Sequence, residues 1–342
     1  MPSTFEPRNN FDLLRLLFAG AVFLAHVGDL SGQPTLAWLP AVFHSDTAVQ
    51  GFFVLSGFLI VMSYERSTGL RQYVSNRVRR IYPAYAAVVL LAALIGAVVS
   101  TRANYWSDGG LAYGFWNLLF LNFIHPTLPG LFEHQVLSAV NGALWTLKIE
   151  VMFYAAVPLI VWMIRRFSFT TICGTYVLST VYFYATTHLA AVHPQGIWLE
   201  VSRQLPGQMR YFIGGVALYY FFDLFRKNAM TIAVAAVALW SIAAWLGGEQ
   251  ILRPMCLAIV VIYAGTCIPY LGNAARFGDL SYGVYILHFP ILQTVVAAGL
   301  FDQSPALAFC ACFVAVATGS LLLWHAVEKP SLRRTSHYRQ ES

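Results

Sequence analysis

The chain has 342 residues, of which 58% are hydrophobic and 11% are charged. A soluble domain carries about 25% charged residues, so this chain lacks the charge to cover a water-facing surface, and the class of soluble proteins is excluded. The net charge of +6 would suit a nucleic acid partner, but the positions of the basic residues, given below, argue against one.

Apolar runs of near-spanning length follow one another along the chain. About 20 apolar residues cross a bilayer core of roughly 30 Å. We predict ten spans, near 11–28, 47–64, 82–99, 145–164, 169–191, 208–225, 230–247, 254–271, 279–299 and 305–326. A weaker run near 114–124, inside the segment 111–135, is short enough to be re-entrant or interfacial.

The sequence therefore predicts an all-α polytopic membrane protein with about ten transmembrane helices and one short re-entrant or interfacial segment. We expect residues 1–342 to form a single membrane-embedded domain with no appended soluble domain. The expected surroundings are a lipid bilayer. No metal site or bound cofactor is expected, and the sequence leaves the oligomeric state open.

Basic residues gather in alternate connections between the predicted spans. Three lie on one side, namely Arg102, Arg203 and Arg253. Fifteen lie on the other side: Arg8, Arg66, Arg71, Arg77, Arg79, Arg80, Arg165, Arg166, Arg226, Lys227, Arg276, Lys329, Arg333, Arg334 and Arg339. Cytoplasmic loops carry the excess of Lys and Arg, so both termini are expected in the cytoplasm. Orientation in the membrane thus accounts for much of the positive charge without any bound partner.

The first predicted span contains two ionisable residues, Arg15 and His26. Charged and titratable groups inside a span are costly, so each is a hypothesis of function. Eleven residues make almost three helical turns, which places both on one helix face, roughly 16 Å apart along the axis. From a cytoplasmic start near Phe11, His26 is expected about three-quarters of the way to the outer surface.

The connection 71–85 is dense in arginine and reaches the membrane at Pro83. Arg77 and Arg80 are three residues apart and share a helix face. Guanidinium groups match phosphate oxygens in geometry. The alternatives are anchoring by the positive-inside rule and contact with anionic lipid headgroups.

The fourth predicted span opens at its outer end with the segment 141–154, which contains Trp145, Lys148 and Glu150. Lys148 and Glu150 are two apart and do not face each other on a helix, so a neutralising pair is disfavoured. Glu150 is expected at a depth similar to that of His26. A carboxylate there could orient the imidazole and stabilise its protonated form.

The segment 279–290 places Ser281, Tyr285 and His288 at i, i+4 and i+7. This spacing gives one polar face to an otherwise apolar run. The face either lines a substrate cavity, with Trp145 as a further candidate for the lining, or forms a hydrogen-bonding seam between helices.

Several of these segments match motifs in the order in which they occur in one family of bacterial membrane proteins. Arg15 and His26 fit an Arg/Lys-x10-His pattern, and GFFVLSGFLI at 51–60 fits a second-span signature. RVRRIYPAY at 77–85 fits an Arg-x-x-Arg loop followed by Pro. WTLKIEVMFY at 145–154 fits a Trp-Ser/Thr-Leu-x-x-Glu-x-x-Phe-Tyr element.

Two more motifs complete the series, LSYGVYILHFP at 280–290 and Glu328-Lys-Pro330. Across essentially its whole length the chain resembles the acyltransferase 3 family, which includes O-antigen and exopolysaccharide O-acetyltransferases. It departs from that family at Gln50-Gly51, where many members carry Asp before the Phe-Phe pair.

The resemblance implies transfer of an acyl group, with acetyl expected, from acyl-CoA to a hydroxyl of a sugar or cell-surface glycan. In that reading Arg15, Arg77 and Arg80 bind the donor, with acyl-CoA as a co-substrate. His26 acts as a general base or carries the acyl group as an acyl-imidazole, and Glu150 orients it.

A transporter or flippase for a lipid-linked sugar or a small anionic substrate is the main alternative. Such proteins also have about ten spans and buried charge, but they commonly show repeated halves and broken helices, which this sequence lacks. A sensor or scaffold that has lost activity is a third possibility. The identity of the acyl group and of the acceptor is not encoded in any motif.

Overall fold

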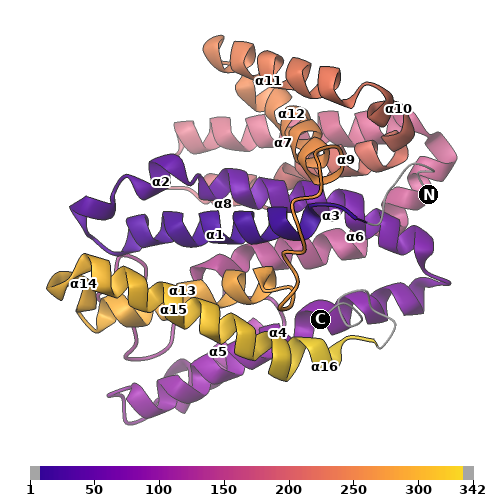
Figure 1. Ribbon diagram of the computed structural model, residues 1–342. Coiled ribbons are helices and arrows are strands. Elements are labelled where there is room, and N and C mark those ends of the chain that lie inside the picture. Colours follow the sequence, from indigo (N-terminus) through magenta and orange to yellow (C-terminus); the bar gives the residue numbers. More distant parts are fainter. Residues whose placement is uncertain (1–7, 334–342) are drawn as a thin grey trace. The chain divides into compact units, whose positions relative to one another are not determined.

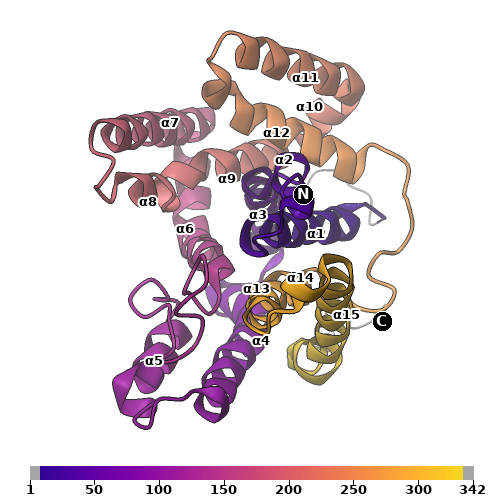
Figure 2. The same cartoon turned by 90° about the vertical axis from the view of Figure 1, so that its left-hand side faces the viewer.

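A computed structural model describes residues 8–333 (Figures 1 and 2), and within that range the chain is helical with no strand. Its residues cluster into two compact units, each assembled from separate stretches of the chain. Unit 1 comprises Met1–Leu14, described from Arg8 onward, Val49–Tyr73 and Ile149–Gly272. Unit 2 comprises Arg15–Ala48, Val74–Lys148 and Asn273–Ser342, described as far as Arg333. The single domain over 1–342 stays a prediction, and Arg334 and Arg339 lie outside the described residues.

Unit 1 holds most of two long helices and a series of helices from the middle of the chain. These are α3 (Ser45–Arg66), α6 (Trp145–Phe167), α7 (Phe169–Val192), α8 (Trp198–Ser202), α9 (Leu205–Tyr220), α10 (Phe222–Lys227), α11 (Ala229–Trp245) and α12 (Glu249–Thr266). Helices α11 and α12 lie side by side, as do α7 and α9.

Unit 2 holds most of α1 and α4 and the helices of the C-terminal region. These are α1 (Phe11–Leu30), η1 (Pro34–Leu36), α2 (Leu39–Val42), α4 (Leu70–Val99), η2 (Trp106–Gly110), α5 (Leu111–Leu118), η3 (Gly142–Leu144), α13 (Ser281–Ala297), α14 (Leu300–Gln303), α15 (Pro305–Leu323), η4 (Trp324–Glu328) and α16 (Lys329–Ser331).

Each of the ten predicted spans overlaps at least one helix, but the count of ten spans is not confirmed. In the described part of the chain, six helical segments are long and apolar enough to cross a membrane: Phe11–Leu30, Pro34–Arg66, Leu70–Val99, Gly142–Phe167, Glu249–Thr266 and Pro305–Ser331. Two apolar helices are shorter, Ala229–Trp245 and Ser281–Ala297. The predicted span 208–225 is divided at Phe221, where α9 ends and α10 follows.

Helices α3 and α9 of unit 1 cross with their backbones in close approach. A Cβ atom built on Gly57 of α3 would lie 2.0 Å from the carbonyl oxygen of Phe212, and one built on Gly215 of α9 would lie 2.1 Å from that of Val54. Small residues let helix backbones approach in this way. In a membrane the hydrophobic effect does not hold helices together, so close van der Waals packing stabilises their association. Glycine is therefore required at both positions.

Asn10 fastens the start of the described chain to the C-terminal end of α12 within unit 1. Its backbone N–H donates to Gly265 O at 2.8 Å, and its side-chain amide donates to Pro269 O at 3.1 Å. Its side-chain oxygen accepts from the N–H of Leu271 at 2.9 Å. The last carbonyl groups of a helix have no donor within the helix. The N–H of Asn10 supplies that donor to Gly265 in the last turn of α12.

Helices α13 and α15 of unit 2 lie side by side and are joined through α14. Gly299 precedes α14 with a φ of 68°, a left-handed conformation that glycine adopts without a steric penalty. Ser304 then caps α15 by accepting from the N–H of Leu307, and Pro305 occupies the first turn. Helix α5 is only eight residues long, in keeping with the short segment predicted near 114–124.

Candidate functional site

His26 on α1 and His288 on α13 form a pair in unit 2, with nearly parallel ring planes and a short contact between ring nitrogens. Nδ1 of His26 lies 2.8 Å from Nε2 of His288, and the ring centroids are 5.1 Å apart with an angle of 15° between the planes. The His288 side chain is fully buried, with 0% of its surface exposed, whereas His26 is partly exposed. The accessible member of the pair is thus the residue that the sequence predicts to be catalytic.

Aromatic rings enclose the pair. The edge of Phe289 meets the His26 ring at 5.4 Å and 83°, and Tyr285 lies 5.9 Å from His288. The hydroxyl of Tyr285 is 2.6 Å from that of Thr146, which in turn donates to Ala143 O. This contact joins α13 to the start of α6.

Pro290 inside α13 explains a second contact with the same region. Proline has no N–H, so the carbonyl of Ile286, four residues earlier, lacks its helical donor. The side-chain amide of Asn141 donates to that oxygen at 2.8 Å. The neighbouring Gly142 has room for Phe289 only because it lacks a side chain, since a Cβ there would lie 2.7 Å from the Phe289 ring. The segment 141–146 is therefore held directly against the helix that carries His288.

Two arginines and two carboxylates form a buried ionic cluster in unit 2. Arg80 on α4 forms an ion pair with Asp279, and its Nη1 donates to Glu328 Oε2 at 2.7 Å. Arg15 on α1 reaches the same Asp279 oxygen at 3.9 Å. Asp279 and Glu328 are both 2% exposed. The cluster places two partly exposed guanidinium groups against two buried carboxyl groups.

Asp279, which precedes α13, is the centre of this cluster. Ser281 donates to its Oδ1 at 2.6 Å. Burial disfavours the charged carboxylate, but the charges of Arg80 and Arg15 and the hydrogen bonds from Ser281 outweigh burial and lower the pKa of Asp279 below its ordinary value. Asp279 is therefore an anion at neutral pH.

The polar face predicted on 279–290 lies on α13 and is buried. Ser281 bonds Asp279, Tyr285 bonds Thr146, and His288 bonds His26. These contacts favour the hydrogen-bonding seam over the cavity lining. Trp145, at the start of α6, is partly exposed. A substrate-lining role for these four residues stays a prediction.

Glu150, the predicted partner of His26, belongs to unit 1. Its Oε1 accepts from the hydroxyls of Ser56 at 3.3 Å and Tyr154 at 2.5 Å. His26 belongs to unit 2, so the contact between Glu150 and His26 stays a prediction.

Sequence reasoning did not single out three groups that the structure brings forward. Asp279 opens the segment 279–290 and Glu328 belongs to the motif Glu328-Lys-Pro330, but the sequence does not identify either as a partner of Arg80. Arg210 was passed over, although it lies inside the predicted span 208–225. It is 1% exposed, stacks on Phe183 at 3.6 Å and donates to Gln250 O. A charged residue inside an apolar run was the signal that could have identified it.

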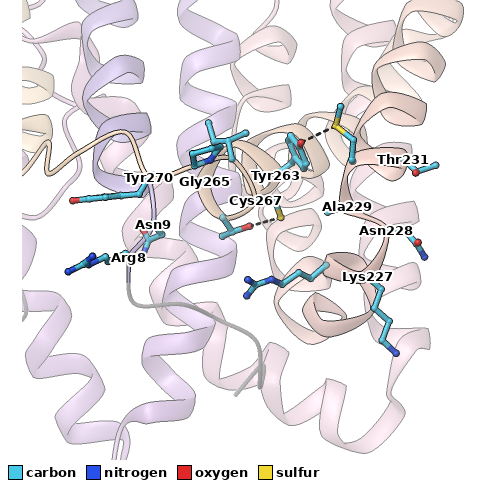
Figure 3. A pocket seen from close by; sticks show the side chains of 15 residues that line it. Arg8, Asn9, Lys227, Asn228, Ala229, Thr231, Tyr263, Gly265, Cys267 and Tyr270 are labelled. Carbon is cyan, nitrogen blue, oxygen red and sulfur yellow. Dashed lines mark hydrogen bonds between the residues drawn. The ribbon is translucent and has the colours of Figure 1, made fainter.

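Unit 1 has a basic cavity of about 700 Å³ at the ends of α10 and α12 (Figure 3). Arg8, Arg226 and Lys227 line it, together with Tyr263 and Tyr270, and the described lining contains no acidic residue. Figure 3 shows that Arg8 and Lys227 come from different elements. Its size and charge suit an anionic ligand.

Comparisons with known proteins agree with the motifs. A family model described as an acyltransferase domain matches residues 8–325. An O-acetyl transferase of Shigella phage Sf6 is 28% identical, with 96% of this chain and 97% of the relative covered. Nodulation protein 10 of Rhizobium leguminosarum bv. viciae is 26% identical, with 96% and 95% covered.

A third relative is the exopolysaccharide production protein ExoZ of Rhizobium meliloti (strain 1021), at 25% identity with 84% of this chain and 89% of the relative covered. No solved structure matches. Because the family model spans nearly the whole described chain, including His26, the ionic cluster residues Arg15, Arg80 and Asp279, and Glu150, this multi-pass membrane protein belongs to the acyltransferase 3 family.

Proposed function

We propose that this protein is an integral membrane O-acyltransferase that moves an acyl group, with acetyl expected, from cytoplasmic acyl-CoA to a hydroxyl of a sugar or cell-surface glycan. Family membership supports the reaction type. The relatives named as an O-acetyl transferase and an exopolysaccharide production protein support the transferred group and the acceptor class. The observation that carries the proposal is a partly exposed imidazole, His26, held by a fully buried one.

His26 supplies the group that the reaction requires. As a general base it takes the proton of the acceptor hydroxyl while that oxygen attacks the thioester carbonyl carbon. The carbon–sulfur bond then breaks, and the thiolate takes up the proton from His26, which leaves an ester and a free thiol. As a nucleophile, His26 would instead hold the acyl group between two transfers. Both routes need a ring nitrogen with a free lone pair.

The donor-binding residues of this proposal are Arg15, Arg77 and Arg80. Both terminal nitrogens of Arg80 already donate to carboxylates, which offset its positive charge and leave fewer of its five N–H groups for a phosphate. The basic cavity at Arg226 and Lys227 is a second location for the phosphates of the donor. Binding of CoA to an Arg77→Gln variant and to an Arg226→Gln/Lys227→Gln variant distinguishes the two locations, because only one of them should weaken it.

The proposed location is a bacterial inner membrane with both termini in the cytoplasm, which follows from the distribution of basic residues. His26 would then lie toward the outer face, suited to an acceptor reached from outside. Labelling of a cysteine placed at position 26 by membrane-impermeant reagents tests this. Labelling from the cytoplasmic side alone is incompatible with an outward acceptor site.

The direct test is transfer from radiolabelled acetyl-CoA to isolated surface glycan by the purified protein in nanodiscs. We expect label in the glycan with the natural protein and none with His26→Ala. A transporter or flippase would neither bind CoA nor consume its thioester, so the absence of both binding and transfer would contradict the proposal.

A further inference from the structure

The hydrogen bonds of the histidine pair define where its protons lie. Nδ1 of His288 is 3.1 Å from the carbonyl oxygen of Val284, one helical turn earlier on α13. A carbonyl oxygen has lone pairs and no proton, so Nδ1 of His288 must be the donor. A neutral imidazole has one N–H, which leaves Nε2 of His288 as an acceptor.

The same reasoning extends to His26. Its Nδ1 lies 2.8 Å from that acceptor nitrogen and must therefore carry the proton between them. Nε2 of His26 is left with its lone pair, and within residues 8–333 it has no hydrogen-bond partner. The order of donors runs from His26 to His288 to Val284, and it ends on a backbone atom that cannot change its role.

Burial keeps His288 neutral and in place. Its side chain has no exposed surface, and Phe23, Tyr285 and Phe289 surround the ring. A charged imidazolium there would lack the solvation or pairing that a buried charge requires. The hydroxyl of Tyr285 lies 2.6 Å from that of Thr146. His288 therefore has neither access to a substrate nor freedom to exchange its tautomer.

We propose that His288 is a positioning residue that fixes the tautomer of His26, so that Nε2 of His26 is the nitrogen that accepts the proton or attacks the acyl group. This inference rests on the proposed function. It assigns to His288 the orientation of the His26 ring, a role expected of Glu150 from the sequence. After Nε2 takes a proton, Nδ1–H still donates to His288, so the ring keeps its orientation through the reaction.

Two substitutions separate positioning from packing. His288→Phe keeps an aromatic ring but removes the acceptor, whereas His288→Gln offers a side-chain oxygen in its place. We expect His288→Phe to lower kcat for acyl transfer roughly 100-fold, within the range for a misdirected general base, with the KM for the donor nearly unchanged. We expect His288→Gln to restore most of that loss. Equal losses in both folded variants, or no loss in His288→Phe, would overturn the assignment.

A measurement without turnover makes the test independent of activity. In the full-length protein labelled with ¹⁵N-histidine in nanodiscs, the signals absent from a His26→Gln variant belong to His26, one of nine histidines. We expect those signals to show a proton on Nδ1 and none on Nε2, and a mixture of tautomers in His288→Phe. A proton on Nε2 in the natural protein would overturn the proposal even if His26 proves essential. Loss of activity in His26→Ala with the expected tautomer would support both proposals.

Discussion

Arg80 donates from Nη1 to Oε2 of Glu328 at 2.7 Å, although 248 positions separate the two residues along the chain. The same guanidinium pairs with Asp279, so one side chain of α4 is bonded to η4 and to the segment before α13. The faces of Tyr282 and Trp324 lie 5.8 and 5.9 Å from it. The arginine-rich motif therefore has a structural role in unit 2 beside any role in binding the donor.

Removal of Asp279 is expected to destabilise the protein strongly. Asp279→Ala leaves Arg80 and Arg15 without their shared carboxylate, and breaking a buried pair in this way costs about 3–5 kcal/mol. Thermal unfolding in detergent measures the change. Arg102→Ala is the control, because Arg102 and Glu133 form an ion pair on the exposed surface of the same unit, and such pairs contribute little. Equal shifts in the two variants would contradict the importance of the cluster.

The ionic cluster also predicts how stability depends on pH. The pKa of Asp279 is lowered in the folded protein, so its contribution is fully present above the ordinary carboxyl value of 3.8 and is lost as pH falls through the lower folded value. The difference in unfolding temperature between the natural protein and Asp279→Asn should stay constant from about pH 5 to 8 and shrink only in stronger acid. A difference that disappears near neutral pH would show that Asp279 is protonated there.

The close crossing of α3 and α9 gives a prediction with a matched control in α1. Gly57→Ala places a methyl group against a backbone oxygen of α9, and overpacking of this kind costs about 1–3 kcal/mol. Gly20→Ala meets nothing within 4 Å and replaces glycine inside a helix, which stabilises by about 0.5–1 kcal/mol. Unfolding of the two variants under identical conditions should therefore change in opposite directions.

The sequence predicts the positions of the helices and the polar face of one helix better than it predicts which side chains contact one another. Apolar length located the helices, and the spacing of Ser281, Tyr285 and His288 correctly placed a polar face on α13. The extent of α4 was missed because the arginine-rich connection is itself helical from Leu70 onward and Pro83 lies inside the helix. The span count stayed uncertain because helices such as Ala229–Trp245 are apolar but short.

Partners depend on tertiary contacts that no local pattern encodes. Nothing in the sequence around His26 indicates that its ring is hydrogen-bonded to a residue 262 positions away. Likewise, the arginine motif alone does not indicate that Arg80 forms ion pairs with Asp279 and Glu328, because both carboxylates lie far from it along the chain. Spacing within one helix is fixed by helical geometry, whereas pairing between helices follows from packing.

The central claim is that His26 performs acyl transfer from acyl-CoA. Release of free thiol from acetyl-CoA by the purified protein in nanodiscs, beside His26→Ala, tests it most directly. We expect slow release by the natural protein, because water can replace the missing acceptor, and none by the variant, with both proteins binding CoA. Equal release by a folded His26→Ala variant would contradict the role of His26, and the absence of CoA binding in the natural protein would contradict the acyl-CoA-dependent reaction itself.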